Sequence, residues 1–176
     1  AEVSYMVNSK WIRSIWYLEK PGIASNHELR IELAAQLTHF VFPPGEFCPN
    51  GFLYIIQRGA ALYAGRMMRD AVGYKSYWGD DIVLRADLQL DFPALSASYM
   101  QVLAIDAESI QNVILKFPTA HRVFASVRHR WAVRRCFVQA AERRSFAATG
   151  QFRGRHRPLY AKELRQDNEE ERTDSL

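Results

Sequence analysis

Two adjacent carboxylates, Asp80 and Asp81, form a pair whose residue types could do acid–base chemistry. Neighbours in a sequence usually point in different directions, so we do not expect them to act as a pair. Ser96 has no histidine and aspartate pattern around it that would activate a nucleophile. His121 and His129 are eight residues apart, which does not fit metal-ligand spacing on a helix. The sequence therefore predicts a regulatory or binding domain and not an enzyme.

The two cysteines, Cys48 and Cys136, lie far apart in the sequence, the first in a predicted loop and the second in a predicted helix. Two thiols are too few for a disulfide framework or a metal site. We therefore expect free thiols in a reducing compartment, with no bound metal and no resident cofactor.

Arginine is concentrated near the end of the chain. Between residues 119 and 157, ten arginines stand against one acid, Glu142, whereas residues 167–174 are acidic. A basic helix beside an acidic tail can bind an anionic partner, the tail itself or a membrane surface. A solvated face is the default interpretation, and contact with another subunit or with anionic lipid is the alternative. We expect no DNA partner, because residues 150–154 cannot begin a helix-turn-helix and too few residues follow.

Helical spacing of apolar residues appears on both sides of the chain's middle. Residues 9–20 place apolar groups at 11/12, 15/16 and 18, and Pro21 and Gly22 end this pattern. A second helix starts near Ser25 or Asn26, with leucines at 29, 33 and 37 on one face. Asp106 is predicted to cap a helix over residues 107–116.

A long helix is predicted to follow from residue 119, after the break at Phe117 and Pro118. Its apolar residues form one stripe, with the arginines on the other faces. The stripe consists of Phe124, Val127, Trp131, Val138 and Ala141.

Six glycines divide the middle of the chain, at positions 45, 51, 59, 65, 73 and 79, with intervals of 6, 8, 6, 8 and 6. Helices exclude glycine at this frequency, because each costs about 1 kcal/mol. Short apolar runs at 52–56, 60–64 and 71–74 lie between them, and closing strands are expected at 94–97 and 99–105. Residues 81–93 break the rhythm and predict a short helix or compact loop. We therefore expect an α+β fold, in which an antiparallel β-roll of double-stranded jelly-roll type over about residues 38–105 is flanked by N-terminal helices and two C-terminal helices.

Five segments, in this order, resemble the cyclic-nucleotide-binding domain family. They are Phe-Pro-Pro-Gly-Glu at 42–46, Leu-Tyr-Ile-Ile-Gln-Arg-Gly at 53–59, Tyr-Trp-Gly-Asp-Asp at 77–81, Ala-Leu-Ser at 94–96 with Val-Leu at 102–103, and Phe-Pro at 117–118. The flanking helices are most similar to those on the cytoplasmic C-termini of voltage-gated potassium channels and cyclic-nucleotide-gated cation channels. The resemblance implies linker helices ending within 1–25, the domain at 26–142, and a flexible basic-then-acidic tail at 143–176.

In this family a cassette of Phe-Gly-Glu, a short helix and Arg-Ser/Thr-Ala binds the cyclic phosphate through backbone N–H groups and the arginine, and the ribose through the glutamate. The candidate ligand-binding residues here are Trp78, Gly79, Asp80, Asp81, Ile82, Arg85 and Ser96. The position of the family's arginine falls near Leu88, and Arg85 lies three residues earlier. Asp87 and Asp91 add negative charge. Losing the arginine costs about 1.5–3 kcal/mol, so we expect weak or no binding of cyclic AMP or cyclic GMP.

The leading functional hypothesis is a gating or assembly module of a voltage-gated, potassium-channel-like protein. It places the chain at the cytoplasmic face of a membrane, with the rest of the channel and the other subunits of a tetramer as partners. A working cyclic-nucleotide sensor and a soluble scaffold subunit are the alternatives. A segment after the last helix fills the pocket in several relatives, and the candidate plug here is Pro158, Leu159 and Tyr160, although a solvated tail is the preferred interpretation. We expect no signal peptide at this N-terminus, and the sequence contains no apolar run of spanning length. Its start without Met predicts a fragment or a processed chain.

Overall fold

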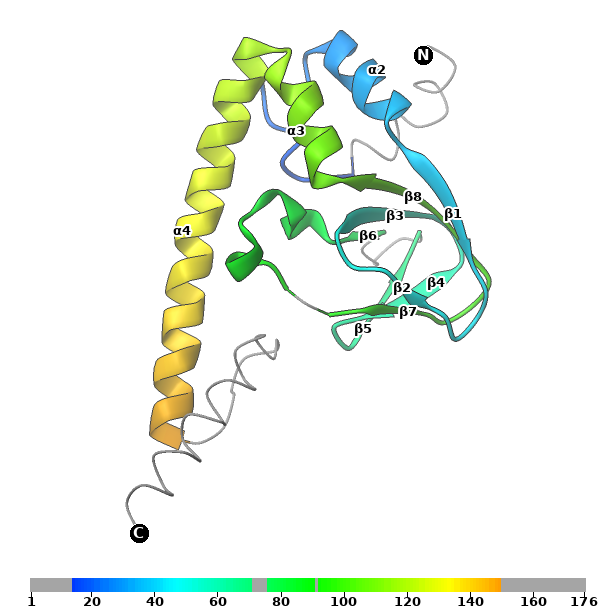
Figure 1. The fold of residues 1–176 in the computed structure, drawn as a ribbon, viewed down its shortest axis with the longest axis vertical. Helices are drawn as coiled ribbons and strands as arrows, with labels where there is room; N and C mark the ends of the chain where they lie inside the picture. Colours follow the sequence, from blue (N-terminus) through cyan, green and yellow to red (C-terminus); the bar gives the residue numbers. More distant parts are fainter. Residues whose placement is uncertain (1–13, 71–75, 91, 150–176) are drawn as a thin grey trace.

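The chain forms two four-stranded antiparallel sheets with helices beside them (Figure 1). The structure, a computed structural model, describes residues 14–70, 76–90 and 92–149, with side chains up to residue 145. The first sheet has the order β1 (Thr38–Phe42), β8 (Met100–Asp106), β3 (Phe52–Arg58) and β6 (Tyr77–Trp78). The second has the order β2 (Phe47–Cys48), β7 (Ala94–Ser96), β4 (Ala60–Tyr63) and β5 (Arg66–Arg69). The predicted α+β class is confirmed, and the finer jelly-roll path stays a prediction.

Left-handed glycines make the turns between these strands. Gly45, Gly51, Gly59, Gly65 and Gly79 all have φ between +72° and +93°. At Gly59 a Cβ atom would also collide with the backbone carbonyl oxygen of Tyr99, because the two chain segments approach closely there. The glycine rhythm of the sequence is therefore a rhythm of turns, as predicted. Gly73 and the predicted apolar run at 71–74 lie outside the described residues.

Two helices begin where the sequence predicts them. The Asn26 side chain accepts a hydrogen bond from the N–H of Leu29 and caps α2 (His27–Ala35). Asp106 accepts from the N–H of Ser109 at 2.8 Å and caps α3 (Ala107–Leu115), as expected. Leu37, which the pattern placed on the face of the first of these helices, lies beyond its end.

The predicted helix at residues 9–20 is wrong for the part that the structure describes. Residues 14–25 form successive turns, held by bonds such as the Leu18 N–H to the Ile15 carbonyl. Tyr17 and Leu18, adjacent in the sequence, are both buried. In a regular helix the side chains of adjacent residues point in directions about 100° apart around the axis. Turns allow the side chains of Tyr17 and Leu18 to pack against the core together. Trp11 lies outside the described residues.

The core has two parts, one on each face of the first sheet. Buried residues of that sheet, α2, α3 and residues 15–23 form one cluster, which Ala120 and Phe124 of α4 (Pro118–Thr149) also join. The other cluster lies between the two sheets and contains Tyr54, Trp78 and Met100. Strands such as β3, buried along most of their length, can face both clusters because alternate side chains point to opposite faces.

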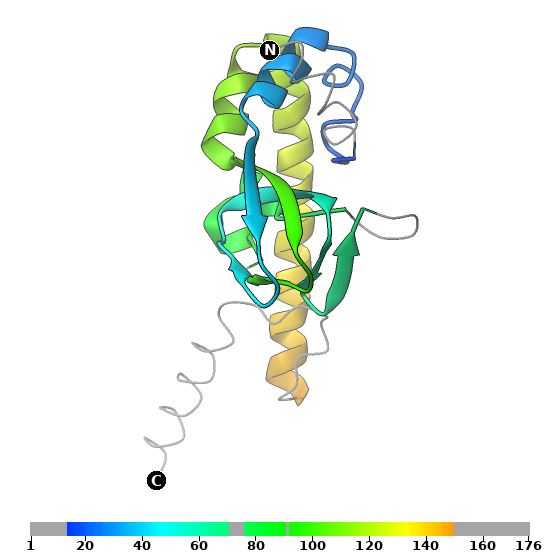
Figure 2. The same ribbon diagram turned by 90° about the vertical axis from the view of Figure 1, so that its right-hand side faces the viewer.

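The long helix α4 runs along the side of the sheets that carries the 3-10 turns η1 (Asp80–Val83) and η2 (Ala86–Leu88) (Figures 1 and 2). Its predicted apolar stripe is correct up to Trp131 and wrong beyond it. Val138, which is 43% exposed, and Ala141 both face solvent. The half-buried positions of this part of the helix carry polar side chains instead, namely Arg135, Gln139 and Glu142. The arginines therefore do not all lie on the other faces.

Three short strands, β2, β5 and β6, were not predicted, because two to four residues carry too little pattern. Cys48 lies buried in β2 rather than in a loop, and Cys136 is exposed on α4. Both thiols are free. Among the helices of the described residues, none combines the length and the hydrophobicity that a bilayer crossing requires.

Candidate functional site

A small cavity lies where the resemblance places a ligand, between the end of β6, the turns η1 and η2, and β3. Its volume is about 180 Å³, below the roughly 300–1,000 Å³ that is usual for small-molecule pockets. Four of the candidate residues line it, namely Trp78, Gly79, Asp81 and Ile82. The other three, Asp80, Arg85 and Ser96, do not.

The apolar wall of the cavity is built from aromatic rings. Trp78 is buried and stacks on Tyr54, with ring centroids 5.0 Å apart and an interplanar angle of 22°. Tyr63 lies 6.3 Å from Trp78 on the same wall. Trp78 is therefore a core residue that also borders the cavity.

Gly79 sets the direction in which the chain leaves β6. Its φ is +72°, and a Cβ atom there would collide with the carbonyl oxygen of Phe52. Glycine is needed for both reasons, since the left-handed conformation and the close approach each exclude a side chain. This turn brings the two following carboxylates between the sheets and α4.

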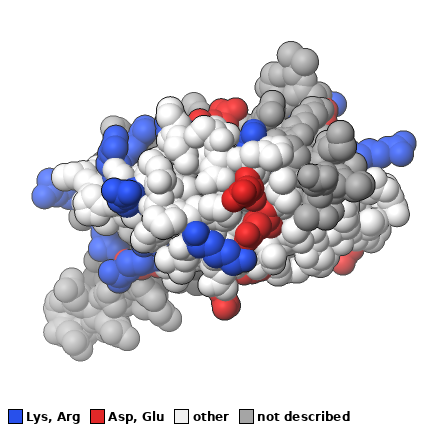
Figure 3. All heavy atoms as spheres, turned by 90° about the horizontal axis from the view of Figure 1, so that it is seen from above, with Lys and Arg blue, Asp and Glu red and all other residues white. Residues whose placement is uncertain are grey.

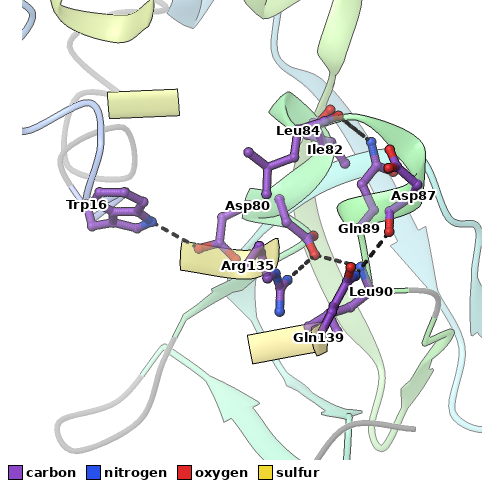
Figure 4. A network of polar contacts seen from close by, with 10 residues as sticks. Trp16, Asp80, Ile82, Leu84, Asp87, Gln89, Leu90, Arg135 and Gln139 are labelled. Carbon is purple, nitrogen blue, oxygen red and sulfur yellow. Dashed lines mark hydrogen bonds and ion pairs between the residues drawn. The ribbon is translucent and has the colours of Figure 1, made fainter. Parts of the chain in front are cut away.

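The adjacent carboxylates point to different partners (Figure 4). Asp80 accepts a hydrogen bond from the indole Nε1–H of Trp16 at 3.2 Å. Asp81 is 4% exposed and faces the cavity. Asp80, which the resemblance matches to a ribose-binding glutamate, thus points away from the cavity, whereas Asp81 borders it.

Asp81 connects the cavity to the long helix. Its Oδ2 atom lies 2.7 Å from Nη2 of Arg135 and accepts the backbone N–H of Leu90, also at 2.7 Å. Burial raises the pKa of Asp81, while the Leu90 N–H and the Arg135 charge lower it; the net shift is upward. The charged carboxylate is therefore held by Arg135 at a cost in desolvation.

The rest of the turn segment, defined as residues 80–90, is held in place by hydrogen bonds within the segment and by one from α4. The Gln89 amide donates to the carbonyls of Ile82 and Leu84, at 3.2 and 2.9 Å. Gln139 of α4 donates to the Asp87 carbonyl at 3.0 Å. Leu88, near which the resemblance places the family's arginine, is buried and apolar.

Arg85 and Ser96 have other roles than lining the cavity. The Arg85 side chain is 84% exposed, with its Nε 3.2 Å from the Asp87 carboxylate. Ser96 is buried and donates to the Ser98 carbonyl at 2.6 Å. Asp91 and the candidate plug, Pro158, Leu159 and Tyr160, lie outside the described residues.

The charge of the cavity is unfavourable for a phosphate. Of the described residues that line it, none is Lys or Arg, and one, Asp81, carries a carboxylate. An entering cyclic phosphate would meet this carboxylate, whose nearby cation, Arg135, is already paired. Like charges at contact distance in a partly buried site repel by several kcal/mol.

Sequence reasoning missed Arg135 and Gln139, two residues of α4 that donate hydrogen bonds to the turn segment. A signal was present, because Trp131, Arg135 and Gln139 are spaced by four residues and share a helix face. The sequence favours a solvated face for Arg135, because charged residues are usually exposed.

Within the described part of the chain, no cluster of three or more His, Cys, Asp or Glu side chains could hold a metal ion. The sequence matches no protein-family model and no curated protein.

Proposed function

We propose that this chain is a cyclic-nucleotide-binding homology domain that acts as a regulatory module, with a pocket that binds nucleotide weakly or not at all. The observation that carries the proposal is the Asp81–Arg135 contact. It joins the turn segment bordering the cavity to α4, and the described residues that line the cavity include no cation that could pair with a phosphate. Arg135 thus holds the turn segment against α4 from within the protein itself.

The two carboxylates supply a mechanical path. Asp80 contacts Trp16, which precedes the sheets, and Asp81 contacts Arg135, which follows them. Because the carboxylates are adjacent in η1, a displacement of α4 is passed through one short turn to residues 14–25. We propose that these residues connect to the pore of a voltage-gated, potassium-channel-like protein at the cytoplasmic face of a membrane, in four copies.

Calorimetry tests the nucleotide part of the proposal. The purified chain is titrated with cyclic AMP and with cyclic GMP up to about 1 mM. A dissociation constant of about 1 mM corresponds to a binding free energy of only about −4 kcal/mol, so even weak binding is detected. We expect no saturable heat. Micromolar binding of either nucleotide would contradict the proposal and support the alternative, a cyclic-nucleotide sensor.

The regulatory part is tested in the full-length protein that contains this chain. We expect Arg135→Gln to shift the voltage dependence of its current, with Arg144→Gln as the matched control that removes an exposed charge from the same helix. A reading frame without a membrane region would exclude the channel assignment and favour a scaffold subunit.

A further inference from the structure

A second and larger cleft lies on the other side of η1, between residues 16–20 and α4. Its volume is about 430 Å³, within the range of small-molecule sites. Trp16, Lys20, Asp80, Arg130, Trp131 and Arg134 line it. None of the last three residues borders the first cavity, so the two sites are separate.

Two indole rings form the apolar part of the cleft. Trp16 and Trp131 meet edge to face, with centroids 5.1 Å apart at 79°. Tyr17, which is fully buried, lies 5.6 Å from Trp16 and 6.2 Å from Trp131 and fixes both rings from behind. The aromatic surface is therefore preformed, and a flat apolar group can pack on it with little loss of side-chain freedom.

The net charge of the residues that line the cleft indicates the charge of the ligand that it can bind. Lys20, Arg130 and Arg134 are exposed and contribute three positive charges, whereas Asp80 contributes one negative charge. The difference, 3 − 1, is a surplus of two positive charges. Figure 3, seen from above, shows Lys and Arg side chains gathered on the side where α4 lies.

Tryptophans beside a carboxylate can also bind a quaternary ammonium ion. Here Asp80 already accepts the Trp16 indole N–H, and Lys20 already lies 5.8 Å over the Trp16 ring. A cationic ligand would meet three like charges and one engaged carboxylate. The observations therefore favour an anion.

We propose that this cleft binds a phosphate monoester carried on an aromatic ring. Such a phosphate has a charge near −2 at neutral pH, which matches the surplus of two. Guanidinium groups bind phosphate oxygens through paired N–H donors, so Arg130 and Arg134 hold the phosphate and Lys20 adds a point charge. The ring packs on Trp16 and Trp131.

Binding there would join the segment before the sheets to the helix after them. Lys20 and Trp16 come from that segment, and Arg130, Trp131 and Arg134 come from α4. A bridging ligand thus strengthens the connection that the Asp80–Trp16 hydrogen bond already makes. This gives the module a regulatory input that does not use the first cavity.

The test is calorimetry of the whole chain at low salt with phenyl phosphate, inorganic phosphate and myo-inositol hexakisphosphate. We expect saturable binding of phenyl phosphate, at least about tenfold tighter than that of inorganic phosphate. The double variant Arg130→Gln/Arg134→Gln should weaken it by about tenfold or more. The matched control, Arg122→Gln/Arg144→Gln, removes the same charge from exposed positions of α4 outside the cleft and should leave it unchanged.

Three outcomes would overturn the proposal. Absence of saturable binding excludes the site, and equal weakening in both double variants shows diffuse attraction to a basic helix. A preference for the inositol phosphate, unaffected by Trp131→Leu, excludes the aromatic ring and indicates a lipid-type headgroup. Circular dichroism of each variant checks the fold. The result is independent of the cyclic-nucleotide titration, because Arg130 and Arg134 do not line the first cavity.

Discussion

The guanidinium of Arg135 lies 2.7 Å from the carboxylate of Asp81, and this ion pair joins two residues that are 54 positions apart in the sequence. The side chains are only 16% and 6% exposed, so water screens the pair little. The same carboxylate oxygen accepts the Leu90 N–H. The position of the turn segment against α4 therefore depends on one buried charge and its partner.

Replacing Arg135 with Met should destabilise the fold by about 2–4 kcal/mol at pH 7, because it leaves a buried carboxylate unpaired. Urea unfolding measures this, with Arg134→Met as the exposed control, which we expect to change stability by less than about 0.5 kcal/mol. The loss should shrink as the pH falls toward the raised pKa of Asp81, since a protonated carboxyl needs no cation. A pH-independent loss would contradict the ion-pair explanation.

A double-mutant cycle isolates the pair itself. Asp81→Asn combined with Arg135→Met should cost less than the sum of the two single changes, because the second change removes a group that the first left unpaired. We expect a coupling free energy of at least about 1 kcal/mol. Additive losses would mean that the two residues contribute independently.

Gly79→Ala should destabilise the protein by at least about 3 kcal/mol. Left-handed backbone costs alanine about 1–2 kcal/mol, and the new Cβ also collides with the Phe52 carbonyl oxygen. Gly45→Ala is the control, because its φ of +83° is similar but nothing lies within 4 Å of the added atom. A loss near 1 kcal/mol is expected there, and equal losses at both positions would exclude the steric contribution at Gly79.

Two phenylalanines of α4, Phe124 and Phe137, should respond differently to truncation. Phe124 is 3% exposed, so Phe124→Ala should cost about 3–5 kcal/mol in chemical denaturation. Phe137 is 73% exposed, and Phe137→Ala should change stability by less than about 0.5 kcal/mol. A large loss at Phe137 in the monomer would place this part of the helix against another surface.

The free energy of unfolding should decrease steadily above about pH 9. Burial raises the pKa of Cys48 to about 11 and that of Tyr54 and Tyr77 to about 12, and it raises the pKa of Tyr17 well above its usual range. The unfolded chain releases these protons at lower pH than the folded chain, so rising pH favours unfolding. Each such group contributes at most about 1.4 kcal/mol per pH unit between its two pKa values.

Thermal unfolding from pH 8 to pH 11 measures this decrease. Cys48→Ala removes the thiol that titrates first in the unfolded chain, so its stability should begin to fall at higher pH than that of the unchanged protein. A constant melting temperature across this range would contradict the burial of these groups.

Local chemistry made much of the fold predictable. Asn26 and Asp106 cap helices with side chains that reach only three residues along the chain. The turn glycines follow from backbone sterics at single positions. Signals of this kind need no knowledge of distant residues, and they located α2, α3, the turns and the longer strands.

The alternation of turns, strands and capped helices therefore follows from local sequence, because these features depend on neighbours a few residues away. The tertiary structure alone decided that residues 14–25 form turns, that Asp80 faces Trp16 while Asp81 faces Arg135, and that the inner face of α4 continues with polar side chains. These features depend on which surfaces meet across long sequence separations. An arginine on a helix has the same local preferences whether it faces water or a buried carboxylate, and only the packing of η1 against α4 distinguishes the two.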